Sequence, residues 1–220
     1  MKTALITGAN RGIGLALTQE YLAQGWRVIA VCRTTSDELD ATEAQVLAGI
    51  DVTSTKALEE LVTKLAGVKI DLLINNAGIF RHEQLGEIEY SSVTQQFLVN
   101  AQAPLQVTEA LLRHLNEGAR IAFITSRMGS IADNTSGGYY GYRMSKAALN
   151  AAAKSLSIDL KSRGIAVAIL HPGYVQTAMV NFGGDISATE SAQRLSKRIA
   201  ELNLKNTGGF WHSNGESLPW

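Results

Sequence analysis

Short apolar runs alternate along this chain with longer segments in which apolar residues recur at helical spacing. The first run, Thr3–Thr7, is followed by Leu15, Leu17 and Tyr21 at helical spacing, and Gln24–Gly25 ends that segment. Strands that alternate with helices are typical of parallel βαβ units. We therefore expect an α/β fold, a doubly wound parallel sheet of about seven strands with helices on both faces.

The pattern continues to the end of the chain without an internal repeat, a linker or a low-complexity tract, and predicts one domain over residues 1–220. Pro104 predicts an irregularity near Asn100, because proline lacks a backbone N–H. Apolar runs predict further strands at 26–32, 46–50, 70–74, 120–125, 165–170 and, shorter, 208–211. A helix is expected to begin at a cap, Thr53 or Ser54, and to end at about 66–67, and a second one is expected at about 93–116. A third helix should follow the loop 127–139 and end at about 163–164. A fourth should begin at a capping box, Ser187 and Glu190, and end at about 202.

Three glycines, Gly8, Gly12 and Gly14, separate the first predicted strand from its helix. Glycine lets the backbone approach a pyrophosphate closely, and the free N–H groups at a helix start bind its negative charge. A tight turn that needs positive φ is the alternative interpretation. Three glycines so close together between a strand and a helix favour a nucleotide-binding turn.

The second predicted strand is followed directly by Arg33, and residues 26–36 contain no Asp or Glu. Units that bind NAD carry an acidic residue about twenty positions beyond the glycines, where it accepts the ribose hydroxyls. A guanidinium suits a phosphate dianion instead, and Thr34, Thr35 and Arg11 offer further donors. Arg33 alone could be an ordinary surface residue, but the missing carboxylate independently favours NADP(H) over NAD.

Composition narrows the classes of function. Twenty basic and twenty acidic residues cancel, so the net charge indicates neither nucleic acid nor an anionic membrane as a partner. Cys32 is the only cysteine, and four scattered histidines form no metal-ligand pattern, so we expect no disulfide framework and no metal. No apolar run is long enough to span a bilayer, and a strand begins almost at Met1, which leaves no room for a signal peptide. We expect a cytoplasmic protein.

Tyr142 and Lys146 are four residues apart on a predicted helix, so the phenol and the ammonium share one face. There the cation can stabilise a phenolate and tune a proton donor. Alone the pair is weak evidence, because many solvated helices carry it. Asn100, in an apolar helical run, is by itself more typical of a core amide or a backbone cap. Residues 174–186 carry apolar side chains with weak periodicity and are either a substrate lid or an ordinary connection.

Together these features resemble the classical short-chain dehydrogenases/reductases over essentially the whole chain. Thr7-Gly8-x-x-x-Gly12-x-Gly14 resembles the cofactor turn of that family, and Asn75-Asn76-Ala77-Gly78 resembles its central-strand signature. Asn100, Ser126, Tyr142 and Lys146 follow one another in the order of its catalytic tetrad, and Pro172–Thr177 resembles its nicotinamide-contacting segment. More narrowly, the glycine turn and the short chain resemble the C-factor/sniffer group of NADPH-dependent carbonyl reductases.

The resemblance implies a Rossmann-type fold and hydride transfer between nicotinamide and a carbonyl or secondary alcohol. Tyr142 would give its proton to the developing alkoxide, and Ser126 would hydrogen-bond the same oxygen. Lys146 would bind the nicotinamide ribose and, with the charge of the oxidised ring, bring the pKa of the phenol from about 10 to near 7, which takes roughly 4 kcal/mol. Asn100 would hold water or backbone for a proton relay. The implied cofactor contacts are Gly8, Asn10, Arg11, Gly12, Ile13, Gly14, Arg33, Thr34, Asp51, Val52, Asn76, Ala77, Gly78, Tyr142, Lys146, Pro172, Gly173, Val175 and Thr177, with Asp51 and Val52 bordering the adenine.

Two features depart from the family pattern. The loop between Ser126 and Tyr142 is a few residues longer than usual, and we take Ser126 rather than Ser130 as the catalytic serine because it directly follows the strand and stands three residues before Gly129. Within the possible lid, residues 178–185 match no substrate-specific pattern, so the substrate is predicted only as a small carbonyl or alcohol compound.

Two other functions stay open: an NADP-binding regulator that does no chemistry, and an NAD-dependent alcohol dehydrogenase or epimerase-like enzyme of the same fold. The family often forms homodimers or homotetramers through the helices that carry Asn100 and Tyr142. The alanines that follow Lys146 are compatible with either assembly.

Overall fold

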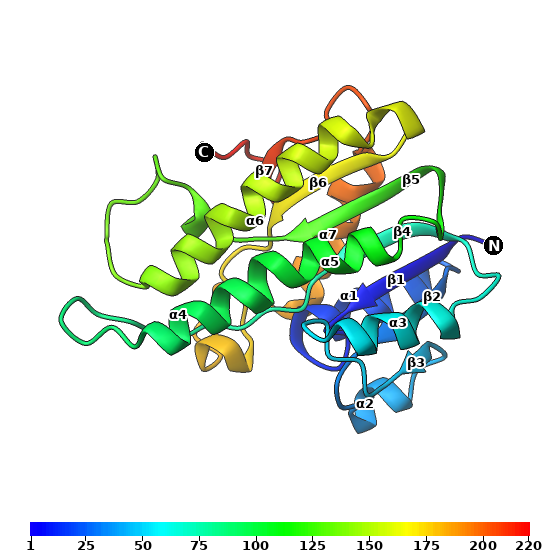
Figure 1. Ribbon diagram of the computed structural model, residues 1–220, viewed down its shortest axis with the longest axis horizontal. Coiled ribbons are helices and arrows are strands. Elements are labelled where there is room, and N and C mark those ends of the chain that lie inside the picture. The colour runs from blue at the N-terminus through cyan, green and yellow to red at the C-terminus, as the bar shows by residue number, and fades with distance from the viewer.

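The computed structural model describes residues 1–220 around one seven-stranded sheet with the strand order β3-β2-β1-β4-β5-β6-β7 (Figure 1). Every pair of neighbouring strands is parallel. The predicted α/β fold with a doubly wound parallel sheet is therefore confirmed. The strands are β1 (Thr3–Thr7), β2 (Arg27–Val31), β3 (Gln45–Leu47), β4 (Ile70–Asn75), β5 (Leu115–Ile124), β6 (Ala166–His171) and β7 (Phe210–His212).

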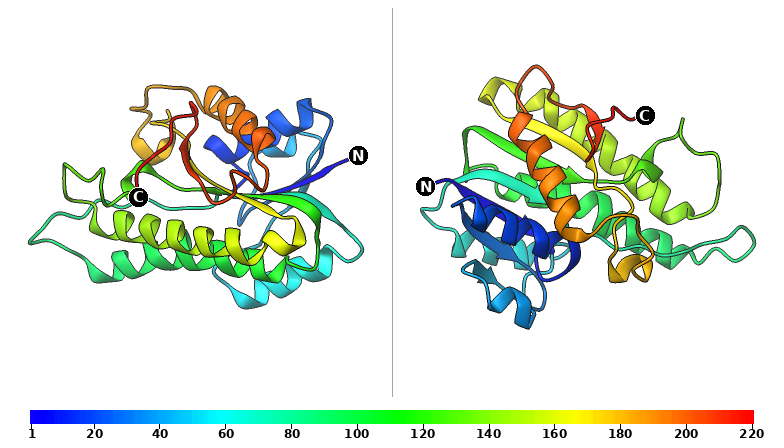
Figure 2. Two further views of the ribbon diagram at one scale, coloured as in Figure 1. Left: turned by 90° about the horizontal axis from the view of Figure 1, so that it is seen from above. Right: turned by 180° about the vertical axis from the view of Figure 1, so that it is seen from behind.

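Helices cover both faces of the sheet, as Figure 2 shows. They are α1 (Gly12–Ala23), α2 (Asp37–Asp40), α3 (Thr55–Lys64), α4 (Tyr90–Phe97), α5 (Ala103–Ala110), α6 (Tyr140–Asp159) and α7 (Ala188–Glu201). A π-helical turn, Leu98–Gln102, joins α4 to α5, and short 3₁₀ turns occupy Arg127–Gly129, Lys161–Arg163 and Ala178–Val180.

The core consists of two apolar layers, one on each face of the sheet. Leu5 and Phe123 are buried in the layer under α3, α5 and α6, whereas Ala4 and Ile6 are buried in the layer under α1 and α7. Successive strand residues point to opposite faces, so a strand covered on both faces reads as a continuous apolar run. Each large aliphatic or aromatic side chain buried in this way contributes about 1.5–3 kcal/mol.

The expected helix at 93–116 is wrong at both ends. α4 already begins at Tyr90, and α5 ends at Ala110, after which Leu115 pairs with Ile70 of β4. Leu111, Leu112 and Leu115 have helical spacing in the sequence, but the pairing across the sheet recruits the last of them into β5. Tertiary pairing thus overrides the local pattern.

The irregularity predicted near Asn100 is confirmed. The π-helical turn Leu98–Gln102 contains Asn100, and Pro104 lies in the first turn of α5 directly after it. Proline has no backbone N–H, so the regular helical bond from residue 104 to the carbonyl of Asn100 is missing, and the π-helical turn lies at this break. The helical segment continues through the turn from α4 to α5.

Other boundaries differ by a few residues. The third strand was expected at 46–50 and is shorter, and α2 was not expected. The hydroxyl of Ser54, and not that of Thr53, caps α3 by accepting from the Ala57 N–H, and the hydroxyl of Ser187 caps α7 by accepting from the Glu190 N–H.

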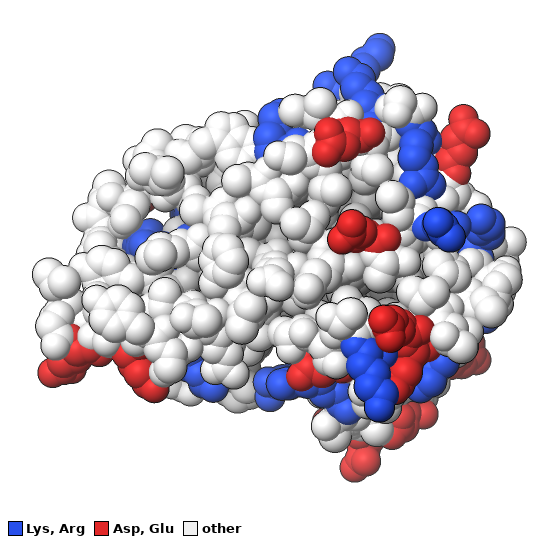
Figure 3. All heavy atoms as spheres, in the orientation of Figure 1, with Lys and Arg blue, Asp and Glu red and all other residues white.

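Charged side chains of both signs are interspersed on the face shown in Figure 3, and the part of that face over α4 and the start of α6 carries few of them. None of the helices combines the length and the apolar character that crossing a bilayer requires.

Candidate active site

The glycine turn lies where the strand order changes direction, between the carboxyl ends of β1 and β4. In an open parallel sheet this crevice is where ligands bind. Asn76, directly after β4, donates from its amide to the carbonyls of Thr7 (3.0 Å) and Gly8 (3.1 Å). The hydroxyl of Thr7 in turn accepts from the N–H groups of Asn76 and Ala77, both at 3.1 Å. These bonds fix the turn against the central strand.

Close packing explains two of the glycines in the turn. A Cβ on Gly14 would lie 2.1 Å from the Gly8 carbonyl oxygen, so no side chain fits there. Gly8 itself has φ +66°, and its Cβ would lie 2.9 Å from the Ala77 Cα. The turn therefore depends on glycine at both positions.

The start of α1 has the features of an anion site. Its N-cap residue, Arg11, makes no side-chain cap hydrogen bond, and the first turn contains no acidic residue. The first N–H groups of a helix have no partner within the helix and carry a partial positive charge. The residues present thus fit a pyrophosphate, which would bind to the backbone of Gly12, Ile13 and Gly14.

Arg33 and Thr34 lie exposed at the end of β2, two strands away from β4 on the same edge of the sheet. The N–H and the hydroxyl of Thr53, which both donate to Asp51, and to a smaller extent the Arg33 guanidinium, lower the pKa of Asp51, which places Arg33 near the segment that follows β3. Asn10 of the glycine turn is joined to the same region, because its carbonyl accepts from the Ser36 hydroxyl at 2.8 Å. Arg33, Thr34, Asp51 and Val52 therefore form one end of the crevice, remote from Ser126 at the end of β5.

Lys146 is buried, and its Nζ donates to the carbonyl of Ile124, the last residue of β5, at 3.0 Å. The same Nζ lies 5.7 Å from the centre of the Tyr142 ring, one turn earlier on α6. Ser126 is buried two residues after Ile124, and its side chain interacts with the phenol of Tyr142. The hydroxyl of Ser130 instead accepts from the Asp133 N–H. Of the two serines, Ser126 is the one beside the phenol.

Asn100 is fully buried, and its side-chain amide bonds the backbone of Ile79. Its Oδ1 accepts from the Ile79 N–H and its Nδ2 donates to the Ile79 carbonyl, both at 2.8 Å. Nδ2 also donates to the Ser145 hydroxyl at 3.0 Å. A Cβ on Gly78 would lie 3.2 Å from Asn100 Oδ1 and 3.8 Å from Lys146 Nζ, so Asn100, Gly78 and Lys146 are neighbours.

The segment after β6 completes the crevice. Pro172 is held by the hydroxyls of Ser191 and Ser213, which donate to its carbonyl at 2.8 and 3.0 Å. Gly173 has φ +96°, and the chain then turns so that a Cβ on Gly12 would lie 3.3 Å from the methyl group of Thr177. Val175 is buried in the same segment. The predicted site residues thus share one edge of the sheet, with the glycine turn between the Arg33 end and the Tyr142 end.

The model of the short chain dehydrogenases matches residues 2–188 of this sequence. The chain belongs to the short-chain dehydrogenase family. It is 38% identical over 226 residues to the 1-hydroxy-2-glutathionyl-2-methyl-3-butene dehydrogenase of Rhodococcus sp. strain AD45, with both chains fully covered.

Two solved structures of carbonyl reductases have the same fold over the whole chain. The carbonyl reductase Sniffer of D. melanogaster superposes with a TM-score of 0.93 at 31% identity, covering 100% of both chains. The NADPH-bound carbonyl reductase from chicken fatty liver gives 0.90 at 31% identity, covering 100% of this chain and 99% of the other. The resemblance to the sniffer-type carbonyl reductases is confirmed at the level of the family and the fold.

Burial dominates the electrostatics of Tyr142 and Lys146 in this short-chain dehydrogenase. It raises the pKa of Tyr142 to about 12, with the Ser126 hydroxyl opposing the shift. The value near 7 expected beside an oxidised nicotinamide ring stays a prediction. The Nζ of Lys146 is directed to the Ile124 carbonyl. Burial also lowers the pKa of Lys146 from 10.5 to about 8. In both side chains, removal from water favours the neutral form.

Phe80 is a residue of the site that the sequence did not indicate. Its ring packs edge-on against Tyr142, with centroids 4.8 Å apart, and stacks on Tyr139 at 5.4 Å. Such aromatic contacts orient the phenol of Tyr142. An aromatic residue in a polar loop gives no periodic signal, so only the tertiary structure reveals this contact.

Glu83 is a second such residue, because its carboxylate is buried although the sequence places it in a polar loop. Its Oε2 accepts from the Gly141 N–H in the first turn of α6 at 3.1 Å, and its Oε1 accepts from Gln96 and, at 3.0 Å, from Ser92. The N-cap residue of α6, Tyr139, makes no side-chain cap bond. Glu83 therefore supplies the negative charge at the start of the helix that carries Tyr142.

Glu83→Gln should lower the free energy of unfolding by about 2–3 kcal/mol, because the amide loses the charge at the helix start and cannot accept all three hydrogen bonds. Urea denaturation measures this change. Glu87→Gln, an exposed position in the same loop, is the control and should lie within about 0.5 kcal/mol of wild type. Equal stability of the two variants would show that the buried carboxylate does not stabilise the helix start.

Lys146→Met should raise the free energy of unfolding at pH 7 by about 2 kcal/mol, because the buried ammonium is destabilising. Since the folded pKa of about 8 lies below the ordinary value of 10.5, the unfolded protein binds more protons between these two pH values. Wild-type stability therefore rises with pH across this window, and the advantage of the variant shrinks. Urea denaturation from pH 7 to 10 measures the difference, and a constant difference would contradict the burial cost assigned to Lys146.

Proposed function

We propose that this short-chain dehydrogenase is an NADPH-dependent carbonyl reductase. The observation that carries the proposal is the meeting of Ser126, Tyr142, Lys146 and Asn100 at the end of the crevice that also contains the glycine turn. The similar carbonyl reductase from chicken fatty liver is NADPH-bound, which supports the choice of cofactor. NADPH, when bound, supplies the hydride that the carbonyl carbon receives.

The residues of this chain supply the proton and the orientation. The phenol of Tyr142 gives its proton to the carbonyl oxygen as that oxygen becomes an alkoxide, and the Ser126 hydroxyl hydrogen-bonds the same oxygen. Because burial keeps the pKa of Tyr142 near 12, the phenol carries its proton at neutral pH, as a proton donor must. Lys146 binds the nicotinamide ribose, and Asn100 fixes the Ile79 peptide beside it.

The cofactor contacts follow the crevice. The pyrophosphate would bind at the glycine turn and the start of α1, and Asp51 and Val52 would border the adenine. Arg33 and Thr34 bind the 2′-phosphate of NADPH, with Arg11 nearby in the turn. Asn76, Ala77 and Gly78 border the nicotinamide end together with Pro172, Gly173, Val175 and Thr177.

Residues 174–186 form the lid over the substrate. Support comes from the bridge between Val175 and Ile186, which closes the segment into a loop, and from the exposed side chains of Tyr174, Met179 and Phe182 on it. The weakly charged face over α4 and α6 is compatible with a homodimer or homotetramer, and the oligomeric state stays a prediction for sedimentation analysis.

Tyr142→Phe should lower kcat for carbonyl reduction by at least about a hundredfold, because the proton donor is lost while the ring keeps its packing against Phe80. Binding of NADPH, measured by fluorescence titration, should survive. Quinones, aldehydes and diketones serve as the panel of substrates. Retained reduction in the variant would eliminate Tyr142 as the proton donor, and binding of NADPH without turnover of any compound by the wild type would favour the non-catalytic regulator.

Arg33→Asp should weaken NADPH binding by about tenfold or more and improve binding of NADH, because a carboxylate repels the 2′-phosphate and accepts from ribose hydroxyls. Arg33→Ala separates loss of the positive charge from gain of the negative one. Arg113→Asp, an exposed arginine just before β5, is the control for net charge. Unchanged discrimination between the two cofactors in Arg33→Asp would eliminate Arg33 as the ligand of the 2′-phosphate, and tighter binding of NADH than of NADPH by the wild type would favour the alternative of an NAD-dependent dehydrogenase.

The name of the Rhodococcus relative contains a glutathionyl group, so we add peptide thioethers to the substrates to be tested. We include them as one subclass of carbonyl and secondary alcohol compounds, beside small neutral ketones. Which subclass the site prefers depends on the side chains around the Tyr142 end of the crevice.

A further inference from the structure

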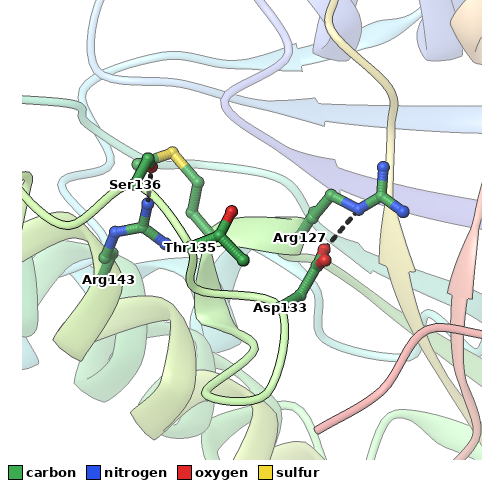
Figure 4. Close-up of a pocket in the computed structure, with 6 residues that line it drawn as sticks. Arg127, Asp133, Thr135, Ser136 and Arg143 are labelled. Carbon is green, nitrogen blue, oxygen red and sulfur yellow. Dashed lines mark hydrogen bonds and ion pairs between the residues drawn. The ribbon is translucent and has the colours of Figure 1, made fainter.

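A polar hollow of about 340 Å³ lies between the segment after Ser126 and the start of α6, and the proposed reaction does not use it (Figure 4). Arg127 directly follows Ser126, and Arg143 directly follows Tyr142. The hollow is thus built from the two segments that carry the proposed catalytic hydroxyls. Its lining residues are Arg127, Met128, Asp133, Thr135, Ser136 and Arg143, of which only Met128 is apolar.

Arg143 gives the hollow a positive charge that no acidic side chain balances. Its Nε donates to the carbonyls of Gly137 (3.4 Å) and Gly138 (3.2 Å), and Nη2 donates to the Ser136 hydroxyl at 2.9 Å. It forms no ion pair, and the structure gives Nη1 no partner. Because a guanidinium has five N–H donors and keeps its charge at every ordinary pH, Arg143 retains donors for an anion.

Arg127 lies on the opposite side of the hollow, with Thr135 between it and Arg143, and its guanidinium is turned away from Thr135, as Figure 4 shows. Its Nε pairs with Asp133 at 2.6 Å, and its Nη2 forms an ion pair with Glu216 at 3.7 Å. Nη1 has no partner in the structure and is free to bind a further oxygen. Because Asp133 and Glu216 pair with Arg127, the guanidinium without an acidic partner is that of Arg143.

We propose that this hollow is a subsite for a carboxylate carried by the substrate, so that the enzyme acts on carbonyl compounds with an acidic tail. The planar fork of a guanidinium matches a carboxylate, and the hydroxyls of Thr135 and Ser136 add donors beside it. The proposal rests on the proposed function, because it assigns the substrate class of the same site. A peptide thioether with free carboxylates is one compound of this class.

A matched pair of ketones tests the subsite: the glutathione conjugate of methyl vinyl ketone, which has two free carboxylates, and its dimethyl ester. Calorimetric titration measures the affinity for each, and NADPH oxidation measures kcat/KM. The wild type should prefer the acid by about tenfold in both measurements. Arg127→Gln and Arg143→Lys should each reduce this preference by about fivefold, the second because an ammonium has no fork.

Arg113→Gln is the matched control, an exposed arginine far from the hollow at the other edge of the sheet, and should leave the preference unchanged. Arg143→Lys alters the bonds from residue 143 to Gly137 and Gly138, whereas Arg127→Gln leaves them intact. If the Arg143 variant does not fold, the Arg127 variant therefore still tests the subsite.

Equal affinity for acid and ester, or a preference that survives both substitutions, would overturn the subsite. A calorimetric preference for the acid without reduction of any carbonyl would support the subsite and contradict the proposed function. Reduction of neutral diketones with no preference for the acid would give the opposite result, a carbonyl reductase whose hollow does not bind carboxylates.

Discussion

One buried ammonium determines much of the geometry of the candidate active site. Lys146 is 4% exposed, and its Nζ reaches the carbonyl of Ile124 at the end of β5. An ammonium removed from water is costly unless oxygen atoms surround it, so the Ile124 carbonyl determines where Lys146 Nζ lies. Tyr142, one helical turn away, lies beside Ser126. This contact, together with the apolar packing of Leu149 and Ala153 against the sheet, brings the three side chains to one place.

The positions next to Lys146 tolerate few other residue types. Gly78 leaves room for the Asn100 amide and for Lys146 Nζ, and Asn100 reaches the Ile79 peptide because the π-helical turn directs it there. Asn76 plays the corresponding part at the glycine turn, where its amide joins β4 to β1. Both amides replace water around backbone groups that the crevice would otherwise leave without partners. The crevice therefore keeps its shape through side-chain bonds to backbone and not through apolar packing alone.

Much of the fold follows from local pattern, because strands covered on both faces are continuous apolar runs and glycines mark the turn between β1 and α1. The places of Ser126 after β5 and of Tyr142 and Lys146 on one helix face also follow from spacing. Long-range pairing does not: Leu115 enters β5 because it pairs with Ile70, and no local feature of the leucines indicates this. The sequence likewise indicates that Glu83 is a solvated loop residue, and only the packing of α6 shows that its carboxylate is buried at the start of that helix.

The protonation of the pair could not be predicted from spacing either, since it depends on how much water the fold removes. Spacing alone suggests that the cation lowers the pKa of the phenol, but burial acts on both groups and favours the neutral form of each. A phenol that holds its proton at neutral pH is prepared to give it to an alkoxide, whereas alcohol oxidation requires a phenolate at the start. An ammonium with a pKa of about 8 releases its proton more readily than an ordinary lysine and is placed one turn behind the phenol. The same loss of water that makes Lys146 costly to the fold therefore keeps the proton on the Tyr142 phenol.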